Sequence, residues 1–246
     1  VYDLITKDLL EAEQLLSEEK DNIVYPRNNE FYFKFQNYRV THCNYYAVLG
    51  MLAKVYWMKG DMENAAKYAQ MVVDSQKFPL ADVSEIKDLF AGKLSDKETL
   101  WGLYSNTFSD NAGSYLYTYQ SYKSYDPYYD GSGSAHLMAY DKIYEQDVTS
   151  VDQDFRKNWF VEGTGYVRCN KIVDYYSLND RAVAPTDWAD RISGINMLHV
   201  SEIYLIGAEA LLQTNYAKAL EYYNKEINSR GLPSLRADQT LTKEMI

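Results

Sequence analysis

Two stretches of this sequence carry the apolar spacing of paired short helices, and this pattern limits the possible folds most. Between 195 and 232, apolar residues recur at the spacing that places side chains on one face of a helix. The polar break at 213–215 separates two such runs, and Gly231 followed by Pro233 is a typical helix stop. The segment therefore predicts a helical hairpin. Its expected inward residues are Val200, Ile203, Tyr204, Gly207, Ala208, Leu211, Leu212, Tyr216, Ala219, Leu220, Tyr223 and Ile227.

Small residues at inward positions indicate how closely the two helices pack. Gly207 and Ala219 would let two antiparallel backbones approach without side-chain collision, as in tetratricopeptide helix hairpins. A second copy of the pattern lies at 47–73, where Ala53 and Ala65 have the same sequence separation. A single copy fits any helical hairpin. Two copies with matched spacing favour a repeat-type architecture.

The composition is that of a soluble globular chain. Its 246 residues are 46% apolar and 24% charged, enough for one large core or two small ones. A net charge of −10 and a pI near 4.8 argue against nucleic-acid binding, which needs clustered Lys and Arg. Apolar runs fall short of the roughly 20 residues that a membrane span requires. We expect any membrane attachment to come from outside this chain.

A tyrosine-rich region lies between the two predicted hairpins, at about 105–194, and shows little helical period. Long irregular segments on a rigid scaffold usually carry function. Its most biased stretch, at 113–130, is dominated by tyrosine. A phenol ring offers a flat apolar face and a polar edge, which matches the C–H face and hydroxyl rim of a sugar ring. The expected ligand-binding residues are Trp101, Tyr104, Tyr115, Tyr117, Tyr119, Tyr125, Tyr128, Tyr129, Trp159 and Trp188.

The alternative role for these aromatic residues is packing, which is the simplest role for tyrosines in the predicted helices and for Trp57. Motifs of catalysis and of cofactor binding are absent: the sequence has no HExxH, GxSxG, Walker or GxGxxG pattern. We therefore predict no catalytic residue, no metal and no cofactor. A run of aspartates from Asp126 to Asp154 could hold calcium, but its spacing is not that of an EF-hand. Cys43 and Cys169 permit one disulfide, although two unbridged thiols are favoured.

The segment 199–232, HVSEIYLIGAEALLQTNYAKALEYYNKEINSRGL, resembles the C-terminal helix pair of the SusD/RagB family of outer-membrane nutrient-binding lipoproteins. The resemblance extends over nearly the whole chain. VYDLITKDLLEAEQLL at 1–16 is similar to the family's helix before the central repeat, and 45–80 is similar to the central helix pair. LFAGKLSDKETLWGLYS at 89–105 is similar to the family's phenylalanine-then-glutamate stretch, which leads into an extended segment.

Two shorter matches complete the resemblance. Asp154 and Arg156 stand where family members often carry an Asp-x-Arg pattern, and LTKEMI at 241–246 resembles the start of the last helix. Two departures concern the family's buried ion-pair network. His199 stands where Arg is common, and Asn228 stands where one of two Arg residues is usual. Whether this chain has such a network stays open at the level of sequence.

The resemblance implies a mainly α fold, in which tetratricopeptide-like helix hairpins form an alpha-alpha superhelix with a long irregular insertion and few short strands. We expect a single SusD-like domain, incomplete at both ends. Its parts would be a helix with the first hairpin at 1–80, the ligand-binding insertion at 81–194, and the second hairpin with the start of the last helix at 195–246.

The resemblance also implies non-catalytic binding of a polysaccharide or oligosaccharide at the cell surface. The expected partner is a SusC-like TonB-dependent outer-membrane transporter, and the expected attachment is an N-terminal lipid on the outer membrane of a Gram-negative cell. Two alternatives remain. A glycoside hydrolase would need paired carboxylates about 5–10 Å apart beside an aromatic cleft. A helical-repeat scaffold would instead bind a peptide in its groove and have no use for the tyrosine-rich insertion.

Overall fold

The computed structural model describes the two predicted hairpins, the strands at the base of the insertion and short parts of the insertion itself. The described residues are 1–23, 39–88, 94–95, 97–105, 107, 121–122, 154–156, 160–163, 166–169 and 194–246. The helices are α1 (Tyr2–Leu15), α2 (Tyr45–Lys59), α3 (Met62–Val73), α8 (Val200–Leu211) and α9 (Tyr216–Ser229). Short 3-10 turns occur at Ser17–Glu19, Arg39–Thr41, Val83–Asp88 and Lys243–Met245.

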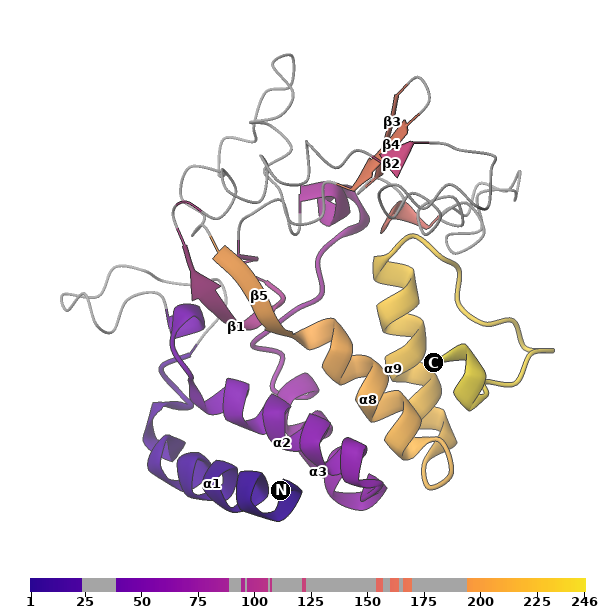
Figure 1. Ribbon diagram of the computed structural model, residues 1–246. Helices are drawn as coiled ribbons and strands as arrows, with labels where there is room; N and C mark the ends of the chain where they lie inside the picture. Colours follow the sequence, from indigo (N-terminus) through magenta and orange to yellow (C-terminus); the bar gives the residue numbers. More distant parts are fainter. Residues whose placement is uncertain are drawn as a thin grey trace.

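The helices form one packed row, in which α1 lies against α2, α2 against α3, α3 against α8 and α8 against α9 (Figure 1). Both predicted hairpins are confirmed, and they meet directly through α3 and α8. Gly207 explains the close approach at this junction. A Cβ atom added there would lie 2.9 Å from the ring of Tyr222 and 3.2 Å from Cβ of Ala69. Among the described ranges, no helix is both long and apolar enough to cross a bilayer.

Polar caps set the ends of these helices. Asn44 begins α2 by accepting a hydrogen bond from the backbone N–H of Ala47, and Asn215 begins α9 in the same way with Lys218. Gly60 ends α2 in the left-handed conformation, with φ at 79°, where a side chain would be strained. Short polar connections of this kind favour antiparallel neighbours, which is the hairpin geometry observed.

The buried face of α9 differs from the predicted one. Tyr216, predicted to point inward, is exposed, whereas Tyr222 and Glu226 are buried. Ala219 is buried as predicted, and the buried face also includes a charged side chain, Glu226, which pairs with Arg230 at the end of the same helix. The sequence 241–246 forms only a single 3-10 turn, at Lys243–Met245, where the resemblance implied the start of a helix.

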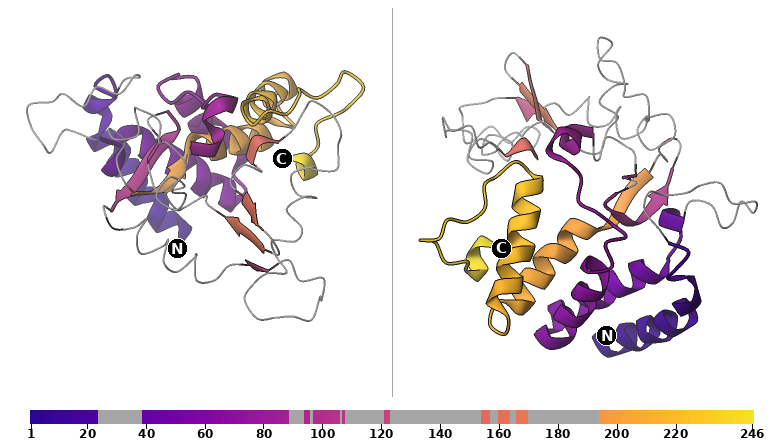
Figure 2. Two further views of the ribbon diagram at one scale, coloured as in Figure 1. Left: turned by 90° about the horizontal axis from the view of Figure 1, so that it is seen from above. Right: turned by 180° about the vertical axis from the view of Figure 1, so that it is seen from behind.

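The strands form two small antiparallel sheets. In the first, β1 (Thr99–Tyr104) pairs with β5 (Gly194–His199), which runs directly into α8. We call this pair the ribbon. The second has the order β2 (Ser121–Tyr122), β4 (Tyr166–Cys169), β3 (Phe160–Gly163). The few short strands expected from the resemblance are confirmed. Figure 2 shows the ribbon from two further sides, extending from the start of α8.

One asparagine holds the ribbon on the helices, at a point where the pairing of the two strands is irregular. The pairing shifts on either side of Trp101, which marks β-bulges. At the first of these, the backbone carbonyl of Leu100 accepts a hydrogen bond from Nδ2 of Asn44, at 2.8 Å. Asn44 is the residue that also begins α2, so the start of this helix and the irregular part of β1 share one buried side chain.

Candidate functional site

Two of the predicted ligand-binding residues, Trp101 and Tyr104, lie on β1, and they differ in exposure. Tyr104, at the end of the strand, is 63% exposed, whereas Trp101 is half-buried and packs against the hydrophobic core. Of the two rings, Tyr104 is therefore the one that β1 presents to solvent. The other predicted ligand-binding residues lie outside the described part of the chain: Tyr115, Tyr117, Tyr119, Tyr125, Tyr128, Tyr129, Trp159 and Trp188.

Exposed apolar side chains accompany Tyr104 on the ribbon. Leu103 is 45% exposed and Met197, on β5, is 47% exposed. Opposite Tyr104 stands Gly194, so no side chain of β5 covers the ring from that position. By the pairing register, Leu103 and Met197 lie on the other face of the ribbon from Tyr104. The ring of Tyr104 itself offers C–H contacts and one hydroxyl, which suits the face and rim of a sugar. Sequence reasoning missed Leu103 and Met197, because nothing in an apolar strand residue signals that it is exposed.

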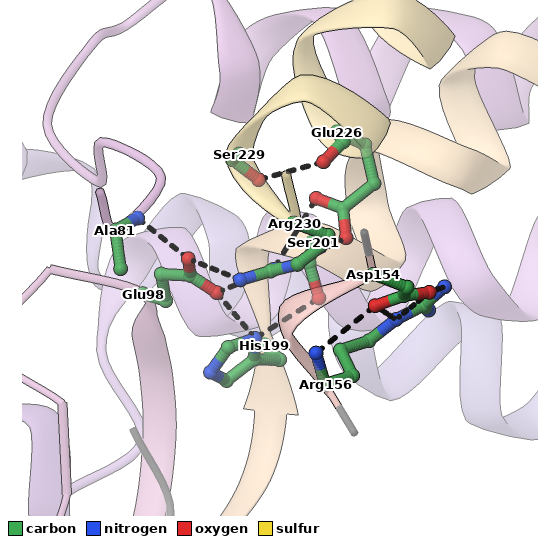
Figure 3. Close-up of polar contacts among 9 residues, drawn as sticks. All are labelled: Ala81, Glu98, Asp154, Arg156, His199, Ser201, Glu226, Ser229 and Arg230. Carbon is green, nitrogen blue, oxygen red and sulfur yellow. Dashed lines mark hydrogen bonds and ion pairs between the residues drawn. The ribbon is translucent and has the colours of Figure 1, made fainter. Parts of the chain in front are cut away.

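A buried charged cluster lies where β1 begins and α9 ends (Figure 3). Glu98, the residue before β1, is fully buried. Its Oε1 accepts hydrogen bonds from Nη1 of Arg230, at 3.0 Å, and from the backbone N–H of Ala81, at 2.6 Å. Its Oε2 accepts one from Nη2 of Arg230, at 2.9 Å, and lies 3.1 Å from Nδ1 of His199.

Arg230, at the C-terminal end of α9, is the centre of this cluster. Besides its two bonds to Glu98, its Nε donates to Oε1 of Glu226 at 2.8 Å, within the same helix. Its backbone carbonyl accepts a hydrogen bond from the N–H of Phe155, also at 2.8 Å. One residue therefore joins α9, the start of β1 and a segment from the middle of the insertion.

The predicted Asp-x-Arg pair forms a compact clip beside the cluster. Asp154 is buried, and its carboxylate accepts hydrogen bonds from Nε of Arg156 at 3.0 Å and from Nη2 at 2.6 Å. It also accepts one from the backbone N–H of Arg156. A two-point contact between a carboxylate and a guanidinium fixes orientation as well as distance. The clip keeps the segment in a defined shape where Phe155 meets the end of α9.

The question left open by the two departures is thereby answered: this chain has a buried ion-pair network. His199 contributes to it by facing Glu98. Asn228 does not, because its side chain is at the surface, where Nδ2 donates to Oγ of Ser234. The clue in the sequence was the four-residue spacing of Glu226 and Arg230, which places them side by side on a helix.

The cluster shifts the pKa values of its two glutamates in opposite directions. Burial alone would raise the pKa of Glu98, but the charges of His199 and Arg230 outweigh it and lower the pKa. Burial raises the pKa of Glu226, and the attraction of Arg230 offsets this only in part. The carboxylates of Glu226 and Glu98 also raise the pKa of the Arg230 guanidinium, against the effect of burial.

This pair of carboxylates does not have the properties of a hydrolase site. Glu98 and Glu226 are both buried, and both direct their oxygens to Arg230. A sugar would have to displace the guanidinium to reach either of them. Within the described residues, no three His, Cys, Asp or Glu side chains are grouped to hold a metal ion. Cys43 is an exposed free thiol.

Comparison with known proteins gives matches among solved structures alone. No family model matches the sequence, and no curated protein matches it. A SusD-like carbohydrate binding protein from Bacteroides vulgatus is similar with a TM-score of 0.59 and 19% identity, covering 97% of this chain and 45% of that chain. Surface glycan-binding protein A from Bacteroides uniformis is similar with a TM-score of 0.59 and 15% identity, over 99% of this chain and 52% of that chain.

A SusD superfamily protein from Bacteroides vulgatus is similar with a TM-score of 0.58 and 22% identity, covering 99% of this chain and 48% of that chain. The chain thus spans about half the length of these structures. Nearly all of this chain is aligned with each of these structures. It agrees with the mainly α architecture and the few strands described above. The chain therefore has the fold of the SusD superfamily.

Proposed function

We propose that this protein binds a polysaccharide or oligosaccharide at the cell surface without chemically changing it. The observation that carries the proposal is the shared fold with proteins described as carbohydrate binding and as surface glycan-binding. The exposed ring of Tyr104 on the ribbon supports it. The tyrosine-rich sequence at 113–130, which follows β1 in the chain, offers more rings of the same kind.

The proposed mechanism is capture by stacking and hydrogen bonding. The ring of Tyr104 would contact the apolar face of a sugar, while hydroxyl groups at the sugar's rim would bond to polar neighbours. We propose the same role for the other predicted ligand-binding residues of the insertion. Trp101, which packs partly against the core, would contribute one edge of its ring. Such contacts tolerate small changes in sugar sequence and suit a chain-like ligand.

Delivery to a transporter is a finer proposal that rests on the sequence resemblance. We propose that the captured glycan passes to a SusC-like TonB-dependent outer-membrane transporter, and that a lipid on an upstream segment anchors the protein to the outer face of that membrane. Co-purification from a native host membrane tests both points. A transporter of this class should appear with the protein, and the protein should partition with lipid-modified proteins in detergent.

The central test is isothermal titration of the full-length protein against soluble starch, xylan, mannan and pectin. We expect saturable binding to at least one of these, with no release of reducing ends. The variant Tyr104→Ala should bind about tenfold more weakly, which corresponds to the loss of one sugar–ring contact of roughly 1.4 kcal/mol. Tyr2→Ala, which removes an exposed ring from α1, is the matched control and should bind as the wild type does.

Two outcomes would contradict the proposal. The first is the absence of binding to any glycan, across this panel and a wider array, by a full-length protein that is folded. The second is the appearance of new reducing ends during incubation, which would favour the glycoside hydrolase. Equal affinity of the Tyr104→Ala and wild-type proteins would remove Tyr104 from the site while leaving the class of ligand untouched.

A further inference from the structure

We propose that Arg230 is a positioning residue, which fixes the glycan-binding region on the helical scaffold through the buried cluster. The inference rests on the proposed function, because it concerns the same site. It goes beyond it by assigning a role to a residue that no sugar touches. Three contacts carry the argument: two tie other parts of the chain to the end of α9, and the third holds the side chain of Arg230 within α9.

The first contact fixes the start of β1. Both guanidinium nitrogens that face Glu98 are used, so the carboxylate is held at two points and cannot rotate. The backbone of Glu98 is held as well, because its carbonyl accepts a hydrogen bond from the N–H of Val200 at 2.9 Å. Thr99 follows at once and pairs with His199. The path of β1, and with it Trp101 and Tyr104, is therefore set from this end.

The second contact fixes the middle of the insertion. The backbone carbonyl of Arg230 accepts a hydrogen bond from the N–H of Phe155, which lies between Asp154 and Arg156 in the sequence. The insertion is thus attached to the scaffold at its beginning by a side chain and at an interior point by a backbone group of the same residue. A shift of the backbone at Arg230 would disturb both attachments together.

The third contact fixes Arg230 itself. Its Nε and Nη2 donate to Glu226, one helical turn earlier on α9, so the guanidinium is held in the plane that Glu98 requires. Only 3% of Arg230 is exposed. Lysine could supply the charge but not the fork of donors. A binding site needs its contact groups within about 0.5 Å of their working positions, which a fully bonded guanidinium can ensure.

The helices have their own means of staying folded. Apolar residues from α2, α3, α8 and α9 form a continuous core that also includes Leu100 and Leu198 of the ribbon. Arg230 lies at the end of α9, beyond the residues of that core. Replacing its side chain should therefore loosen the ribbon before it unfolds the hairpins.

The test uses full-length protein labelled with 5-fluorotryptophan and compares Arg230→Met and Arg230→Lys with the wild type. The fluorine resonance of Trp101 is assigned by its absence from the variant Trp101→Phe. It should broaden or shift in both Arg230 variants, whereas the resonance of Trp57, on α2, should not change. Affinity for the best-bound polysaccharide of the titration panel should fall about tenfold in Arg230→Met. Arg236→Met, which removes an exposed arginine paired with Asp238, is the control and should change neither readout.

Helix content by circular dichroism separates positioning from general stability. An unmoved Trp101 resonance in folded Arg230→Met would overturn the inference, and so would an unchanged affinity. If Arg230→Met does not fold, Glu226→Gln provides the second variant. It removes the carboxylate that holds the Arg230 guanidinium in place and leaves the guanidinium itself. An unmoved Trp101 resonance in Glu226→Gln would also overturn the inference. If no glycan binds the wild type, the proposed function fails, while the fluorine resonance still decides whether Arg230 positions β1.

Discussion

The two helical hairpins have the same backbone plan but bury different chemistry. The α2–α3 hairpin is closed by apolar and aromatic contacts, with the rings of Tyr56 and Tyr68 stacked at 5.7 Å between centroids. The α8–α9 hairpin buries Glu226 and Arg230 at the end of its apolar stripe. The comparison shows that the same helix pair can serve for packing at one place in a scaffold and as a charged anchor at another.

A shared feature makes the difference clearer. Each hairpin has one buried tyrosine whose hydroxyl donates to a carboxylate of a neighbouring element. Tyr68 donates to Glu13 of α1 at 3.0 Å, and Tyr222 donates to Asp74 at the end of α3, at 2.8 Å. Burial raises the pKa of both phenols, so both remain protonated donors. What sets α9 apart is thus the charged end and not the polar contact between helices.

Removing a charge from the buried cluster of Glu98, Glu226 and Arg230 should have the largest effect on the stability of the protein. Glu98→Gln removes one carboxylate from a buried ion-pair cluster, and such a loss costs about 3–5 kcal/mol because the remaining charges stay buried. We expect the urea midpoint of unfolding to fall accordingly. Glu221→Gln is the control, since Glu221 pairs with Lys225 on the outer side of α9, where an exposed pair contributes less than about 1 kcal/mol. Similar losses in the two variants would mean that the cluster is no anchor.

An intermediate effect is expected where the hairpins meet. Gly207→Ala gives the second hairpin the residue that the first has at Ala53, and it places a methyl group 2.9 Å from the ring of Tyr222. Overpacking of this kind costs about 1–3 kcal/mol. The reverse exchange, Ala53→Gly, should cost about 1 kcal/mol through helix propensity and roughly 1 kcal/mol more through the loss of a buried methyl group. Thermal unfolding measures both. A stable Gly207→Ala protein would show that the junction has room that the structure does not indicate.

The smallest expected effect is a change in how the stability of the protein depends on pH. Because the pKa of Glu226 is raised in the folded state, its contribution to stability is complete below the ordinary value of 4.5 and is lost as the pH rises through the raised value. Glu98 has a lowered pKa, so its contribution is lost as the pH falls. As the pH rises above 4.5, Glu226→Gln should therefore lose less stability than the wild type. Urea unfolding at several pH values tests this, and parallel curves for the two proteins would count against a raised pKa.

Much of the scaffold could be predicted because its determinants are local. Periodic apolar residues, the caps Asn44 and Asn215, and the glycines Gly60 and Gly231 lie within or beside the helices that they define. The exception is α9, whose buried face includes Glu226. A pattern of apolar residues assigns a charged side chain to the outside, so the burial of Glu226 could not be found from that pattern.

The candidate site was less predictable because its contacts join distant residues. The bond between Glu98 and Arg230 spans a sequence separation of 132, and no local pattern links the two. Resemblance pointed to the stretch that contains Glu98 and to the Asp154–Arg156 pair, but it also suggested that the network was incomplete at His199 and Asn228. The exposure of each side chain was equally hard to predict from the sequence. Trp101 and Tyr104 are both aromatic strand residues, yet Trp101 packs on the core and Tyr104 faces solvent.

The direct contact of α3 with α8 has a consequence for how such a protein can change. Since α3 and α8 contact each other directly and β1 pairs with β5, the chain between these two strands has a fixed base. Doubling the length of such a loop costs only about 0.6 kcal/mol in closure entropy. We expect the stretch between the two strands to tolerate exchange of its sequence as long as Glu98, Phe155 and His199, which hold it to the scaffold, are kept.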